Sequence, residues 1–201
     1  MPLPSPPPYV LRGASLLDSI NRIIGRAMLW PIFAAVIVSA GNAVSRKFFG
    51  VSSNAWLEIQ WHLFAVSFLC CAGYVLLVDE HVRVDVLSSR WSTRTQAWVD
   101  IAMLLCFALP MTVVIGTLST ELFLRRFASG EIYINAGGLP VWPIVLAMPL
   151  SMALLGLQCI SELVRRWHFL SGGTDKPALS EADLKPFLLA HEFVSSRRHR
   201  Q

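Results

Sequence analysis

The amino-acid sequence predicts an all-α integral membrane protein with four transmembrane helices, an N-terminal amphipathic interfacial helix and both termini in the cytoplasm. Four apolar stretches support this prediction, at 28–45, 55–78, 98–120 and 141–164. Each approaches the ~20 residues that a helix needs to cross ~30 Å of hydrocarbon, where the backbone must satisfy its own hydrogen bonds. The composition agrees, because 54% of the 201 residues are hydrophobic and only 15% are charged.

The seven tryptophans support the predicted helix ends. All of them lie at or near the boundary of an apolar stretch, where the lipid–water interface favours an amphipathic indole ring. They are Trp30, Trp56, Trp61, Trp91, Trp98, Trp142 and Trp167. The alternative is the core of a soluble helical protein, which the length and apolarity of the four stretches disfavour.

The positive charges predict the orientation. All but four of the 17 lysines and arginines lie in the N-terminal segment, the 79–97 loop or the C-terminal segment. The four on the other side are Arg46, Lys47, Arg125 and Arg126. Because cytoplasmic loops carry the excess of lysine and arginine, we expect both termini in the cytoplasm. Membrane topology then explains the net charge of +4, and no nucleic-acid partner is expected.

The N-terminal segment has two parts. Residues 1–10 are rich in proline and predict a disordered tail. Over 11–27, apolar residues recur at helical spacing, which predicts an amphipathic helix lying against membrane lipid in the cytoplasmic interface. A helix that only extends the first span into water is the alternative. Residues 38–40 resemble a signal-peptide cleavage site, but the polar segment before them is too long for such a peptide. The polar residues of the amphipathic helix are Arg12, Asp18, Ser19, Asn21, Arg22 and Arg26.

Capping residues and prolines shape the rest of the membrane domain, which is expected to cover 11–168. Thr93 with Gln96 predicts a capping box at the start of the third helix. Pro110 and Pro149 lie in mid-span and predict kinks, whereas Pro143 fits a first helical turn. The remaining segment, 169–201, is predicted to be a polar cytoplasmic tail.

Glu58 and His62 are the leading candidates for a role beyond packing. They lie four residues apart on the second helix, so they share a face and can form a hydrogen bond. Ionisable groups at membrane depth usually face protein or water. A contact with a partner subunit, a proton relay and an ordinary position at headgroup level all fit them. Arg46 closes the first span and is placed to pair with Glu58 or with a lipid phosphate.

The 79–97 loop contains alternating polar residues and valines. His81, Arg83 and Asp85 would share one side of an extended segment, which resembles a docking edge. A solvated loop is the alternative. Farther along, Glu121 and Arg125 are spaced for an ion pair within the third helix.

No catalytic, cofactor-binding or metal-binding pattern is found in the sequence. It has no nucleophile with an adjacent base, no glycine loop for phosphate and no zinc-ligand spacing. The four cysteines fall inside apolar stretches, and His62 is the only one of the five histidines that does. A haem protein with paired histidine ligands is therefore disfavoured, but a stand-alone membrane enzyme or redox carrier stays an alternative at this point.

Several motifs in order resemble the small, Q-type membrane subunit of tripartite ATP-independent periplasmic (TRAP) transporters. The resemblance covers about 20–168. His62 departs from it, because an aromatic residue such as tyrosine is expected there. The motifs are RKFFG at 46–50, SNAWLEIQW at 53–61, HVRVDV at 81–86, GGLP at 137–140 and WP at 142–143.

The resemblance implies a transport role in the bacterial inner membrane and no enzymatic activity. In such systems a periplasmic binding protein delivers an organic acid to the membrane complex. The large membrane subunit holds the substrate and sodium sites and moves as an elevator, and the small subunit braces it. This chain would then need no cofactor of its own. Arg83 and Asp85 would order the loop or dock a partner.

Overall fold

The computed structural model of the chain describes residues 5–50, 54–78, 92–134 and 138–173. Within these residues the secondary structure is helical, apart from one isolated bridge between Ile132 and Pro140. Four helical stretches are long and apolar enough to cross a membrane, as the sequence predicts. They cover Pro8–Phe49, Asn54–Leu77, Thr93–Ser129 and Trp142–Leu170.

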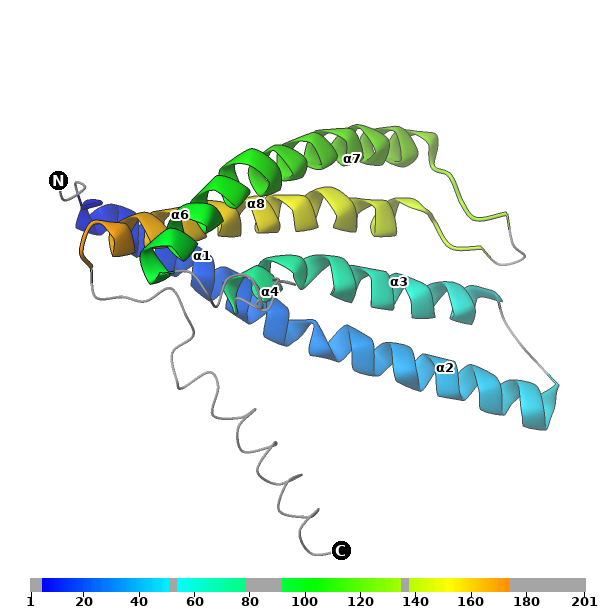
Figure 1. Cartoon of the computed structure of the whole chain (residues 1–201). Coiled ribbons are helices and arrows are strands. Elements are labelled where there is room, and N and C mark those ends of the chain that lie inside the picture. Colours follow the sequence, from blue (N-terminus) through cyan, green and yellow to red (C-terminus); the bar gives the residue numbers. More distant parts are fainter. Residues whose placement is uncertain (1–4, 51–53, 79–91, 135–137, 174–201) are drawn as a thin grey trace, which may run out of the picture.

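The first stretch is a long rod of two helices, α1 (Pro8–Ala27) and α2 (Leu29–Phe49), with only Met28 between them (Figure 1). Proline at the start of α1 costs no hydrogen bond, because that backbone position has no acceptor within the helix. α2 ends at Gly50, whose φ of 65° is a left-handed conformation that glycine adopts without strain. α1 begins at Pro8, before the predicted residue 11. Residues 1–4 of the predicted tail lie outside the described residues.

The second stretch runs back beside α2. It consists of α3 (Asn54–Cys70) and the short α4 (Ala72–Leu77), with Cys71 in a turn between them. α3 packs along α2, whereas α4 packs against α1 and α8 (Trp142–Leu170) (Figure 1). The second stretch thus connects the first rod to the rest of the bundle.

The third stretch is bent. It contains α6 (Thr93–Met103), a π-helical segment (Leu104–Ala108) and α7 (Leu109–Ser129). Pro110 follows the π-helical segment and has no backbone N–H to donate to the carbonyl four residues earlier, so the helix widens there. The bend in Figure 1 agrees with the kink that Pro110 predicts.

The start of α6 corrects the predicted capping box. Ser92 is the N-cap residue, and its hydroxyl accepts a hydrogen bond from the backbone N–H of Thr95 at 3.3 Å. The prediction from Thr93 and Gln96 was one residue too late. Ser92 has extended backbone angles, whereas Thr93 is already the first helical residue, so only Ser92 can point its side chain back at the free N–H groups.

α8 is the central helix of the bundle. It lies between α7 and α3 in Figure 1, and it also packs against α1, α4 and α6. Pro143 lies in its first turn, as predicted, and the helix continues through Pro149. Most of the core therefore forms along this one helix. One core cluster consists of Leu76, Leu104 and Cys159, and a second consists of Ala97, Ile101 and Leu170.

The bundle has two ends. We call the end with the start of α1 and the end of α8 the terminal end, and the end with Gly50 and the 130–141 connection the hairpin end (Figure 1). Between them, large apolar side chains cover the outside: Trp30 is 74% exposed, Phe68 72% and Phe107 66%. A surface of this kind is suited to lipid or to apolar protein partners.

Candidate functional site

Glu58 anchors the hairpin-end connection. Its carboxylate accepts a hydrogen bond from the backbone N–H of Leu139 at 2.8 Å, and its side chain is only 2% exposed. Within the connection, the N–H of Tyr133 donates to the carbonyl of Leu139 at 3.1 Å, and that of Val141 to the carbonyl of Glu131 at 3.0 Å. Glu58 thus faces the interior of this chain, where it holds the connection against α3.

Aromatic rings surround this anchor. The ring of Tyr133 meets those of Trp61 and His62 edge-on, with centroids 5.2 Å and 5.6 Å away. His62 bonds through Nδ1 to the backbone carbonyl of Glu58 at 2.5 Å, so the predicted pair does meet, but not through the carboxylate. The imidazole ring of His62 thus packs between the rings of Trp61 and Tyr133. Burial, and then the charge of Glu58, raises the pKa of Tyr133.

The outcomes for the other predicted polar residues differ. Arg46 is exposed near the end of α2, and no ion pair of its side chain is found among the described residues. Glu58, one of its predicted partners, instead accepts a hydrogen bond from the backbone N–H of Leu139. His81, Arg83 and Asp85 lie outside the described residues. The predicted ion pair between Glu121 and Arg125 is confirmed.

A buried polar cluster joins α1 to α8 near the terminal end. Gln158 donates to the Oδ1 of Asp18 at 2.9 Å and accepts from the Nδ2 of Asn21 at 2.9 Å. Ser161 donates to the same Asp18 oxygen at 2.7 Å. All four side chains are at most 2% exposed. The sequence places Asp18 and Asn21 on the polar face of α1, but it does not indicate their partners on α8.

Two glycines let α1 approach α4 closely. A Cβ at Gly25 would overlap the ring of Tyr74, and a Cβ at Gly73 would overlap the amide oxygen of Asn21. Close approach through small residues is a usual way for membrane helices to pack. α1 is therefore fitted against α4 as well as bonded to α8.

Two adjacent arginines of α8 bind different helices. Arg165 pairs with Asp18 of α1, and Arg166 pairs with Asp100 of α6. Arg166 also lies 3.4 Å from Glu162, one turn away on α8, and its side chain is 4% exposed. Because a buried charge is costly without a partner, these pairs fix α1 and α6 relative to α8.

Large apolar side chains lie on the outer side of α1, together with exposed polar residues such as Arg12 and Ser19. Leu16 is 65% exposed, Ile20 45% and Ile23 68%, whereas Asp18 and Asn21 point into the bundle. The buried polar side chains of α1 thus face the other helices of this chain. The apolar side is free to contact lipid or another protein.

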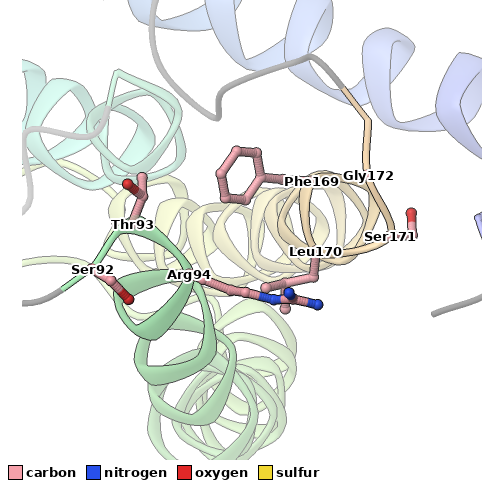
Figure 2. A pocket seen from close by; sticks show the side chains of 7 residues that line it. All are labelled: Ser92, Thr93, Arg94, Phe169, Leu170, Ser171 and Gly172. Atoms are coloured by element: carbon pink, nitrogen blue, oxygen red, sulfur yellow. The ribbon is translucent and has the colours of Figure 1, made fainter. Parts of the chain in front are cut away.

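Hollows open on the surface beside α8 in the part of the chain that the structure describes. Figure 2 shows one of about 680 Å³ between the start of α6 and the end of α8. The other, of about 770 Å³, is an apolar groove between α7 and α8. The groove hydroxyls of Thr112, Thr117 and Thr120 donate to carbonyls of their own helix. The first hollow is lined by Ser92, Thr93, Arg94, Phe169, Leu170, Ser171 and Gly172.

Comparison with known proteins identifies the family. A sequence profile described as tripartite ATP-independent periplasmic transporters, DctQ component, matches residues 29–169, well over half of the chain. The chain belongs to this family. It is a small membrane component of a TRAP transporter, and the family is non-enzymatic. No curated protein and no solved structure matches the chain.

The match confirms the resemblance seen in the sequence motifs. This DctQ component is a multi-pass membrane protein and a part of a tripartite system. The matched region begins at Leu29, so it contains α2 to α8 but not α1. The bonds of α1 to Gln158 and Ser161 therefore attach a helix outside the matched region to a helix within it.

Proposed function

We propose that this DctQ component braces the large membrane subunit of a sodium-coupled TRAP transporter in the bacterial inner membrane. The large subunit would import an organic acid that a periplasmic binding protein delivers. Family membership supports this proposal most directly. A non-enzymatic small component of a tripartite transporter is expected to act through its contacts with the other components.

The distribution of polar and apolar groups supports a bracing role. Inside the bundle, polar bonds connect α1 with α8, α6 with α8, and α3 with the hairpin-end connection. Outside, exposed side chains such as Phe33, Phe64 and Val113 are apolar. Helices joined internally by hydrogen bonds and ion pairs resist displacement, because lipid offers those groups no alternative partner. Such a body suits a fixed support for a subunit that moves.

We further propose that the terminal end lies in the cytoplasm and the hairpin end in the periplasm. The distribution of lysine and arginine supports this orientation. α1 would then lie near the cytoplasmic interface, with Leu16, Ile20 and Ile23 toward lipid or the large subunit. Cysteines introduced at exposed Ser15 and Ser129 provide a test, because a membrane-impermeant thiol reagent applied from outside should label only the second.

Reconstituted transport tests the bracing role. Proteoliposomes would contain the large subunit with or without this chain, and uptake of a labelled organic acid would be measured with the loaded binding protein outside. We expect uptake only with both subunits and an inward sodium gradient. Undiminished uptake without this chain would contradict the bracing role, and uptake independent of sodium would contradict the coupling.

A second proposal concerns the motif at 81–86. We propose that Arg83 and Asp85 order their loop or dock the large subunit, a role supported by their place in the family-like motif. Asp85→Ala should lower both the yield of the co-purified complex and its uptake rate. If both are unchanged, the loop has only a solvated role.

A further inference from the structure

The bend between α6 and α7 leaves one backbone carbonyl, that of Leu105, without its usual partner. In an α-helix this oxygen accepts from the N–H of the residue four positions later, and in a π-helix from the residue five positions later. The N–H of Leu109 donates instead to the carbonyl of Leu104. The residue five positions later is Pro110, which has no N–H. The helix backbone therefore supplies no donor to the Leu105 oxygen.

No side chain among the described residues replaces this donor. Hydroxyl groups often do so where a proline interrupts a membrane helix. The nearest hydroxyl along the chain, that of Thr112, donates to the carbonyl of Leu109 at 2.8 Å. A carbonyl without a donor is costly in hydrocarbon, because lipid tails cannot form the missing bond.

The missing bond lies on the outside of the bundle. Leu105 is 51% exposed, and Cys106 and Pro110 are exposed beside it. Among the helices outside this bent rod, the π-helical segment packs mainly against α8 (Figure 1). We call Leu105, Cys106, Pro110 and the exposed Val113 the π-segment face. The described residues leave this face uncovered.

The π-segment face continues into the apolar groove between α7 and α8. Leu109 and Val113 line the start of this groove, and Gly116 and Gly156 line it farther along. Small residues at a membrane-helix surface allow another helix to approach closely. The surface thus combines an apolar groove with one hydrogen-bond acceptor near its end, which fits a helix that carries a single polar side chain.

We propose that the Leu105 carbonyl accepts a hydrogen bond from a side chain on a membrane helix of the large subunit, and that this helix lies along the π-segment face and the groove. The inference rests on the proposed function and deepens it by naming a contact. Lipid hydrocarbon carries no donor, whereas serine, threonine, asparagine or tryptophan on a membrane helix does. The large subunit is the membrane-embedded partner in the proposed function.

Photo-cross-linking tests which molecule covers the π-segment face. A photoreactive amino acid in place of Cys106 would be activated in membranes that contain both subunits, with Leu105 and Pro110 unchanged. We expect a covalent product of this chain with the large subunit, and no such product in membranes that lack the large subunit. Products with lipid or with a second copy of this chain alone, or no product at all, would overturn the proposal.

Pro110→Ala tests the hydrogen bond itself, because alanine supplies the missing N–H within the helix. Energy transfer between labelled subunits, diluted stepwise in liposomes, would measure their association. We expect association about 3- to 20-fold weaker, the effect of one hydrogen bond between membrane helices. Pro149→Ala is the matched control. It also supplies an N–H inside a helix, but the carbonyl four residues earlier belongs to buried Val145, so association should be unchanged.

The stability of the chain alone distinguishes this role from a merely structural one. In a denaturing-detergent titration, Pro110→Ala should be at least as stable as the unmodified chain, because an unpaired acceptor becomes bonded. Unchanged association with Pro110→Ala would overturn the proposal. If this variant does not fold, the cross-linking result decides. Failure of the unmodified chain to associate with the large subunit would instead contradict the proposed function.

Discussion

Replacing Gln158 with leucine should loosen α1 from α8. The side chain is fully buried, donates to Asp18 and accepts from Asn21, both at 2.9 Å. Hydrogen bonds between membrane helices contribute about 0.6 kcal/mol on average and up to about 1.7 kcal/mol. Asp18 keeps its bond to Ser161, and Asn21 keeps one to the carbonyl of Leu17. We therefore expect a loss of about 1–2 kcal/mol, or roughly a 5- to 30-fold lower ratio of folded to unfolded chain.

A reversible denaturing-detergent titration of the purified chain would measure this loss by tryptophan fluorescence. A double-mutant cycle of Asn21→Leu and Gln158→Leu isolates the bond between the two side chains. Gln60→Leu is the matched control, because Gln60 is half-buried on α3 and no hydrogen bond of its side chain is seen in the described part of the chain. A coupling free energy of zero, or equal effects at Gln60 and Gln158, would refute the reasoning.

Three further predictions follow from other contacts. Gly25→Ala should destabilise the chain by about 1–3 kcal/mol through overlap with a ring of α4, whereas Gly13→Ala, with open space around it, should be neutral or slightly stabilising in the same titration. Arg166→Met breaks buried ion pairs and should cost about 3 kcal/mol, whereas Arg125→Met breaks an exposed pair and should cost about 0.5 kcal/mol or less. Phenolate absorbance should show that the pKa of Tyr133 lies above that of free tyrosine, about 10. The contribution of the neutral Tyr133 side chain to stability is then complete below a pH of about 10 and is lost as the pH rises through the raised pKa. An unshifted titration midpoint would contradict the burial of Tyr133.

The sequence predicted the helices well because span length and apolarity are local properties. It also placed Pro110 at a kink, and the π-helical segment before it shows how the backbone accommodates the missing donor. The capping error at α6 was small and has a local cause, since Ser92 and Thr93 are both good N-cap residues and only backbone angles distinguish them. Family motifs added the transporter role, which periodicity alone does not indicate.

The sequence did not predict which residues the buried polar side chains contact. Glu58 meets Leu139 across 81 positions, and Asn21 meets Gln158 across 137. Helical spacing says which residues share a face, but it does not say which helix that face meets. Gln158 and Ser161 were a usable signal, because two polar residues three apart in an apolar span have to face protein or water.

The proposed contact of α1 with lipid explains the direction in which its polar and apolar residues face. In water the apolar side of such a helix packs inward, so Asp18 and Asn21 would be expected on the surface. Here they are buried against α8, and Leu16 and Ile23 point outward. A leucine side chain that faces lipid loses no hydrophobic stabilisation. A hydrogen bond inside the bundle has no water to compete with it. The bonds between elements lie inside the bundle, around Gln158 and around Glu58, whereas large apolar side chains cover much of the outside. A partner subunit can therefore cover that outer surface without breaking any bond that holds this chain together.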